Sequence, residues 1–87
     1  MTMRLQDARI LITGAGGYLG RQLVARLPAL PPEQRPAKIV AHDLRLPETP
    51  LSGVEYLACD IRSPDVEQAI AQLGITVVVH LAAIMPS

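Results

Sequence analysis

The sequence predicts an α/β fold built on a parallel sheet, and three observations carry this prediction. Four short segments rich in β-branched residues are almost continuously apolar, which is typical of strands buried on both faces of a sheet. Two segments between them place apolar residues at helical spacing. A glycine-rich turn at residues 14–20 separates the first strand from the first helix, which is the context that gives a glycine motif its meaning.

The first strand and the first helix lie on either side of that turn. Residues 9–13 form the predicted strand, which stops at Gly14. The helix begins after Gly17 and ends before Pro28, because proline lacks the N–H group that another turn would need. Residues 28–36 contain four prolines and are expected to form a surface loop.

The remaining elements follow from similar signals. Residues 38–43 and 54–58 form the second and third strands, and the proline-rich residues 44–53 are expected to join them without a covering helix. Ser63 at the N-cap and Pro64 at the first position predict the start of the second helix, and Gly74 predicts its end. Residues 75–80 form the fourth strand.

Together these elements predict the N-terminal half of a Rossmann-type fold. Right-handed crossovers between parallel strands give the strand order 3-2-1-4, with one helix on each face of the sheet. Residues 1–87 then form one NAD(P)-binding segment. The fourth strand keeps an unpaired apolar edge, so the sheet is incomplete. We expect either that the chain is truncated before the rest of the sheet and a substrate domain, or that a partner covers this edge.

Composition narrows the possible partners. The chain has 8 basic and 8 acidic residues and no net charge, so we expect neither nucleic acid nor a membrane surface as a partner. The longest apolar run, residues 77–85, is far shorter than the roughly 20 residues of a membrane helix. A single cysteine, Cys59, and the lack of a signal-peptide pattern favour a cytoplasmic location. We expect no metal site.

The glycine turn is a candidate phosphate site. Backbone N–H groups at a helix N-terminus lack intrahelical partners, and the helix dipole adds partial positive charge there, so a pyrophosphate can bind without a cationic side chain. Gly14 permits the tight turn, Gly17 lets the backbone approach the phosphates, and Gly20 lets the helix pack closely. The predicted cofactor-binding residues of the turn are Gly14, Gly16, Gly17, Tyr18, Leu19 and Gly20.

The spacing of the glycines discriminates between kinds of nucleotide site. The Gly-x-Gly-x-x-Gly dehydrogenase pattern would place its third glycine at position 19, which is Leu19. A mononucleotide P-loop would need Gly-Lys-Ser/Thr, but Arg21 and Gln22 follow Gly20. The motif that fits has three-residue spacing and is preceded by Thr13.

Four signatures in order give the chain a resemblance to a known family. They are Thr13 with the three-residue glycine spacing, Asp43 at the end of the second strand, Asp60-Ile61 after the third, and His80-Leu81-Ala82-Ala83 ending the fourth. The chain resembles the N-terminal part of the extended short-chain dehydrogenase/reductase family, which contains NAD-dependent sugar-nucleotide epimerases, dehydratases and related sugar dehydrogenases.

The resemblance implies a role for each matching residue. Asp43 accepts hydrogen bonds from the adenosine ribose and repels a 2′-phosphate, which favours NAD over NADP; Arg45 keeps NADP open, because a nearby arginine can accept that phosphate. Asp60 meets the adenine amino group and the Ile61 amide faces a ring nitrogen. Leu81, Ala82 and Ala83 form a backbone wall beside the nicotinamide ribose.

Each of these interpretations has a structural alternative. Asp43 can be a solvated acid at a strand end, and Asp60 a turn former before Ser63. We interpret His42 and His80 as core or strand-end histidines rather than catalysts. Cys59 has no basic neighbour in sequence and is interpreted as a small packing residue.

The resemblance implies hydride transfer assisted by a Tyr and a Lys four residues later, beyond the fourth strand. Tyr18 and Tyr56 are followed at that spacing by Gln22 and Asp60, so we predict no catalytic residue here and no activity for the 87 residues alone. The parent protein is expected to be an NAD-dependent epimerase, dehydratase or sugar dehydrogenase, a homodimer acting on a sugar or nucleotide sugar. The alternatives are a non-catalytic, redox-sensing module and an NADP-dependent reductase.

Overall fold

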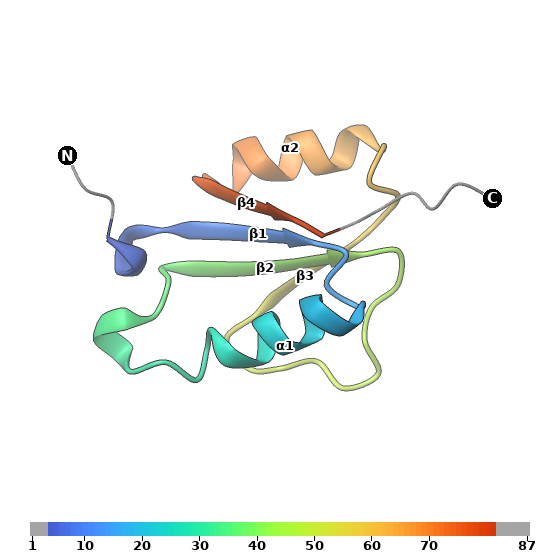
Figure 1. The fold of residues 1–87 in the computed structure, drawn as a ribbon. Coiled ribbons are helices and arrows are strands. Elements are labelled where there is room, and N and C mark those ends of the chain that lie inside the picture. Colours follow the sequence, from blue (N-terminus) through green and yellow to red (C-terminus); the bar gives the residue numbers. More distant parts are fainter. Residues whose placement is uncertain (1–3, 82–87) are drawn as a thin grey trace.

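The computed structural model describes residues 4–81 and contains one four-stranded sheet (Figure 1). The strands are β1 (Arg9–Thr13), β2 (Lys38–Asp43), β3 (Glu55–Ala58) and β4 (Val77–His80). All neighbouring strands are parallel, and their order is β3-β2-β1-β4. The predicted fold class and strand order are therefore confirmed.

Two α-helices lie on opposite faces of this sheet (Figure 1). They are α1 (Tyr18–Arg26) and α2 (Pro64–Gln72). Of two short 3-10 helices, η1 (Leu5–Asp7) precedes β1, and η2 (Pro32–Gln34) lies in the proline-rich loop between α1 and β2. Side chains alternate along each strand, so Ile10 and Ile12 pack with Val24 of α1, whereas Leu11 packs with Val66 of α2. The core therefore consists of two apolar clusters, one between α1 and one face of the sheet and one between α2 and the other face.

The two outer strands are less buried than the two central strands. β1 and β2 are buried along most of their length, but residues alternate between half-buried and exposed in β4, and Val78 remains 48% exposed. β3 has exposed residues at both ends. Each outer strand pairs with one neighbour among the described residues, whereas β1 and β2 each pair with two. The burial expected of parallel strands is thus seen in β1 and β2, and the exposure of β4 agrees with the expected incomplete sheet.

The helix α2 has the ends that its sequence predicted. The Ser63 hydroxyl oxygen accepts a hydrogen bond from the Asp65 amide at 3.1 Å, which satisfies one of the unpaired N–H groups of the first turn. Gly74 adopts a φ of +64°, and the Ile75 amide donates to the Ile70 carbonyl at 3.0 Å, as in a Schellman motif. Because Ile75 completes this helix end, β4 begins at Val77 and not at residue 75.

The turn between β1 and α1 depends on two of its glycines for different reasons. Gly14 has a φ of +70°, a conformation that residues with a Cβ rarely adopt. A Cβ on Gly20 would lie 2.6 Å from both the Gly14 carbonyl oxygen and the Ala15 Cα, so α1 packs directly on the turn through backbone atoms. A Cβ on Gly17 would meet only the Gly14 oxygen, at an ordinary 3.5 Å.

We therefore expect Gly20→Ala to lower the free energy of unfolding by about 1–3 kcal/mol, the range for overpacking against a rigid neighbour. Gly17→Ala is the matched control and should cost less than about 1 kcal/mol, mainly through the poorer N-cap preference of alanine. Urea denaturation of both variants measures the difference. Equal losses for the two variants would contradict the close-packing role of Gly20.

Neither helix in residues 4–81 has the length and apolar character needed to cross a membrane.

Candidate dinucleotide-binding site

The parallel sheet brings the predicted site residues to one edge. Because all four strands run the same way, their carboxyl ends meet there, and Thr13 pairs with His42 on one side and His80 on the other. The glycine turn follows β1, Asp43 ends β2, residues 60–61 follow β3 and Leu81 follows β4. Ligands of open α/β sheets bind at this edge, where the connections to either side diverge.

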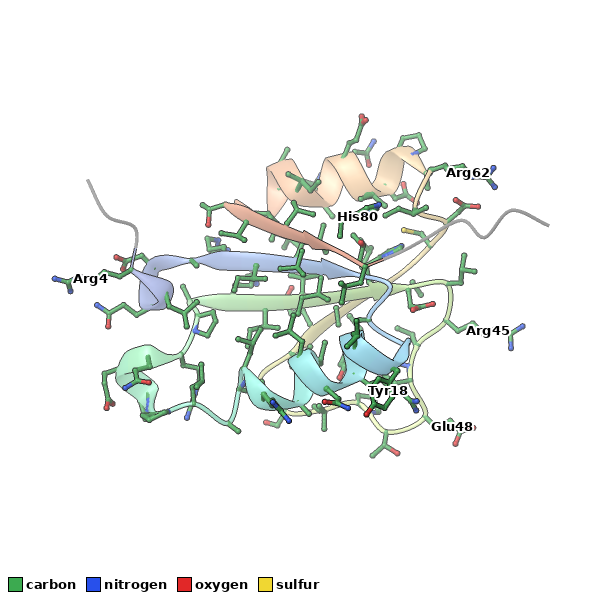
Figure 2. The ribbon with its side chains drawn as sticks, in the orientation of Figure 1. Arg4, Tyr18, Arg45, Glu48, Arg62 and His80 are labelled. Atoms are coloured by element: carbon green, nitrogen blue, oxygen red, sulfur yellow. The ribbon has the colours of Figure 1, made fainter. Side chains whose placement is uncertain are left out.

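The N-terminus of α1 is open to solvent. Gly17 is its N-cap, no side chain caps the helix, and no acidic residue lies in the first turn. Tyr18, labelled in Figure 2, is 72% exposed, and Leu19 is 66% exposed. By contrast, α2 carries the Ser63 cap and two acids in its first turn. The first-turn N–H groups of α1 therefore fit an external anion, whereas α2 supplies its own acceptors.

Asp43 joins the end of β2 to the glycine turn. Its Oδ2 accepts a hydrogen bond from the Gly16 amide at 2.8 Å, and its Oδ1 accepts one from the Leu44 amide at 2.7 Å. The carboxylate is only partly buried. Each oxygen keeps a further acceptor position, so the group can also accept hydrogen bonds from a ligand hydroxyl.

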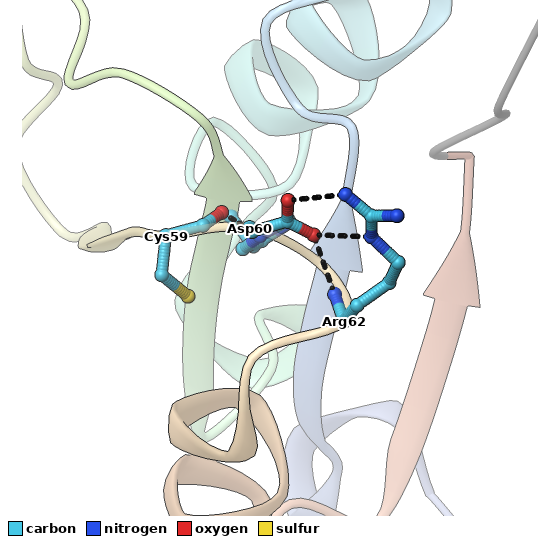
Figure 3. A network of polar contacts seen from close by, with 4 residues as sticks. Cys59, Asp60 and Arg62 are labelled. Atoms are coloured by element: carbon cyan, nitrogen blue, oxygen red, sulfur yellow. Dashed lines mark hydrogen bonds and ion pairs between the residues drawn. The ribbon is translucent and has the colours of Figure 1, made fainter.

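Asp60 is held by its neighbour Arg62 (Figure 3). Its Oδ1 accepts from the Arg62 amide at 2.8 Å and from Nε at 3.1 Å, and its Oδ2 accepts from Nη2 at 3.0 Å. These bonds to Arg62 lower the pKa of the Asp60 carboxyl to about 2. Arg62 was not predicted as a partner of Asp60, although an arginine two residues after an acid that follows a strand is a usable signal.

The pairing predicts a measurable titration. A carboxyl with a lowered pKa contributes its stabilisation above the ordinary pKa of 3.8 and loses it as the pH falls through about 2. In Arg62→Ala the Asp60 pKa should return toward 3.8, because the side-chain donors are removed. Carboxyl ¹³C shifts followed over pH measure both proteins; an unchanged Asp60 titration in the variant would show that the pair does not form in solution.

A cavity of about 540 Å³ lies beside Asp43 on the α1 side of the sheet. Its wall includes Gly16, Asp43 and parts of the loop after β2, with Arg21 from α1 and Arg45 from the loop. Figure 2 shows Arg45 extending from the loop toward solvent. Arg45 was predicted from the sequence as a possible phosphate contact, but Arg21 was not, because its approach to the same cavity depends on how α1 packs.

The two histidines lie in one row with Thr13 at the sheet edge. The Thr13 hydroxyl and His80 Nδ1 share a hydrogen bond of 2.8 Å, and the Leu81 amide donates to the Thr13 hydroxyl at 3.1 Å. His42 is buried, and its Nε2 is 2.8 Å from the Cys59 carbonyl. Since a carbonyl only accepts, Nε2 carries the hydrogen. These contacts agree with strand-end and core roles.

Other predicted residues have the following places. The side chain of Ile61 packs in the α2-side core with Cys59, and burial, followed by Asp65 and Asp60, raises the pKa of the Cys59 thiol, which suits a packing role. Ala82 and Ala83 lie outside the described residues. Within residues 4–81, no group of three or more His, Cys, Asp or Glu side chains could hold a metal ion.

The strand order and the connections define the N-terminal half of a Rossmann-type fold. The model of the NAD dependent epimerase/dehydratase family matches residues 10–87, and the chain belongs to this family, as its four signatures indicated. The family implies a nicotinamide dinucleotide cofactor.

A curated relative supports the same assignment. The chain is 34% identical over 82 residues to short-chain dehydrogenase/reductase family 42E member 1 of Macaca fascicularis, a match that covers 92% of this chain and 20% of that protein. The chain therefore spans about a fifth of the length of this relative. No solved structure matches the chain significantly.

Proposed function

We propose that this chain binds NAD as the cofactor-binding part of an NAD-dependent epimerase, dehydratase or sugar dehydrogenase. One observation carries the proposal: the uncapped, exposed N-terminus of α1 follows directly from the glycine turn, and the carboxylate of Asp43 lies against that turn. N–H donors that can bind an anion thus lie next to a carboxylate that can accept hydrogen bonds from hydroxyl groups. A dinucleotide, with its pyrophosphate and its ribose, requires this combination.

The glycine turn fits the pyrophosphate on steric grounds. A Cβ on Gly17 would meet no atom of the protein closer than 3.5 Å, and Gly17 is exposed. The protein itself therefore does not demand glycine at this position. A ligand brought close to the backbone would demand it, and the exposed amides of the following helix turn supply the donors.

Asp43 supports NAD as the cofactor. Its oxygens can accept the ribose hydroxyls in addition to their present bonds, whereas a 2′-phosphate would meet the negative carboxylate. Arg21 and Arg45 line the same cavity and favour the alternative of NADP, because arginine binds phosphate well. NAD binding would therefore depend on the Asp43 carboxylate, whereas NADP binding would depend on the arginines of this cavity.

The remaining roles rest on family membership. We assign the Asp60 carboxylate and the Ile61 amide to the adenine, and Leu81, Ala82 and Ala83 to the nicotinamide ribose. For Asp60 this requires sharing the carboxylate with Arg62, which leaves acceptor positions free. The bound nicotinamide would supply hydride transfer. A sugar or nucleotide-sugar substrate, a homodimer and a cytoplasmic location remain proposals for the whole protein.

Calorimetric titration with NAD and NADP tests the assignment of Asp43. The protein should bind NAD more tightly than NADP, and Asp43→Ala should weaken NAD binding about tenfold, which corresponds to about 1.4 kcal/mol for lost charge-assisted hydrogen bonds. Glu48→Ala is the matched control, because it removes the same charge from another residue of the cavity wall. NAD affinity that survives Asp43→Ala unchanged would refute this role.

The NADP alternative has its own test. If the arginines of the cavity bind a 2′-phosphate, Arg45→Ala should weaken NADP binding about tenfold and leave NAD binding nearly unchanged. Under our proposal Arg45→Ala changes neither affinity by more than about twofold. If Arg45→Ala selectively loses NADP binding, and if the unaltered protein binds NADP more tightly than NAD, then NADP and not NAD is the cofactor.

A further inference from the structure

Hydrogen bonds join Asp43 to the glycine turn and to the start of the following loop. The Gly16 amide donates to Asp43 Oδ2 across 27 residues of sequence, and the Leu44 amide occupies Oδ1. We propose that Asp43 is a positioning residue, which holds the glycine turn in its binding shape through the Gly16 amide, and that position 16 is glycine to leave room for this carboxylate.

The arrangement requires a carboxylate and not merely a polar side chain. Two N–H donors approach two different oxygens of Asp43. An asparagine has one acceptor oxygen and turns an NH₂ group toward the second donor, so it can satisfy only one of the two amides. The acid at position 43 thus has a role within the protein that is separate from its proposed contact with the ribose.

The space at position 16 is filled by the same carboxylate. A Cβ on Gly16 would lie 2.9 Å from Asp43 Oδ2 and 3.2 Å from its Cγ, and the three nearest atoms all belong to Asp43. Gly16 does not have the positive φ of Gly14, so the backbone itself would accept an alanine. An alanine at position 16 therefore acts through the displacement of Asp43.

These contacts predict that substitutions at the two positions depend on each other. Gly16→Ala in the otherwise unaltered protein should push the carboxylate away and break its bond to the residue-16 amide. In the Asp43→Ala background the obstructing Oδ2 and Cγ are gone, and the atom that remains, Cβ, lies 3.8 Å away. There, Gly16→Ala should have almost no further effect. This dependence separates a direct contact from general damage to the turn.

Amide hydrogen exchange at residue 16, measured by NMR without cofactor, tests the contact. Asp43→Ala should speed this exchange about tenfold, the scale of one lost bond to a charged acceptor, and Asp43→Asn should speed exchange at residue 16 or at Leu44, because its single acceptor oxygen can satisfy only one of the two amides. Gly17→Ala is the control, since its Cβ would approach only the Gly14 oxygen, and it should leave the exchange at Gly16 unchanged. Unchanged exchange in both Asp43 variants would overturn the proposal.

The effect on the cofactor rests on the proposed function and needs a second measurement. Gly16→Ala should weaken NAD binding about tenfold in the unaltered background and by less than about twofold in the Asp43→Ala background. Equal losses in both backgrounds would overturn the positioning role. If the exchange rates change as expected but the unaltered protein does not bind NAD, the contact stands and the proposed function fails.

Discussion

The backbone contact between Gly20 and the turn at residues 14–15 is the constraint on which the rest of this structure depends. Only a residue without a Cβ fits there, because that atom would lie 2.6 Å from main-chain atoms that cannot move aside. The contact brings α1 close enough for Val24 to pack on the sheet. It also fixes the direction in which the first-turn amides point, so the packing of one core half and the proposed phosphate site share a single steric cause.

The order of the strands places the other proposed binding residues beside the glycine turn. β1 lies at the centre, between β2 and β4, and the polar row at its carboxyl end runs from His42 through Thr13 to His80. Hydrogen bonds from this row reach the residues that follow the two outer strands. The His42 ring contacts the Cys59 carbonyl after β3, and the Thr13 hydroxyl accepts a hydrogen bond from the Leu81 amide after β4. The segments that carry the proposed adenine and nicotinamide contacts are therefore anchored to the same strand ends as the glycine turn.

Local chemistry explains what the sequence could predict, and distance along the chain explains what it could not. Strand order, the Ser63 cap and the Gly74 stop follow from short patterns and from the handedness of crossovers, and all were correct. The bond from Gly16 to Asp43 joins residues 27 positions apart, and the approach of Arg21 to the cavity depends on the packing of α1. The exposure of β4 agrees with the incomplete sheet that the strand order and the two helices predicted.

Three glycines of the turn are each required for a different structural reason. Gly14 supplies a backbone conformation, Gly16 leaves space for a side chain from another strand, and Gly20 leaves space for the turn itself. Gly17 has neither a positive φ nor a close neighbour, since its Cβ would approach only the Gly14 oxygen at 3.5 Å. Substitutions at these positions must therefore fail in different ways: through backbone strain, displacement of Asp43, loss of helix packing, or obstruction of a ligand. Only the last of these depends on a cofactor, so Gly17 is the position at which stability and dinucleotide binding can be separated by a single methyl group.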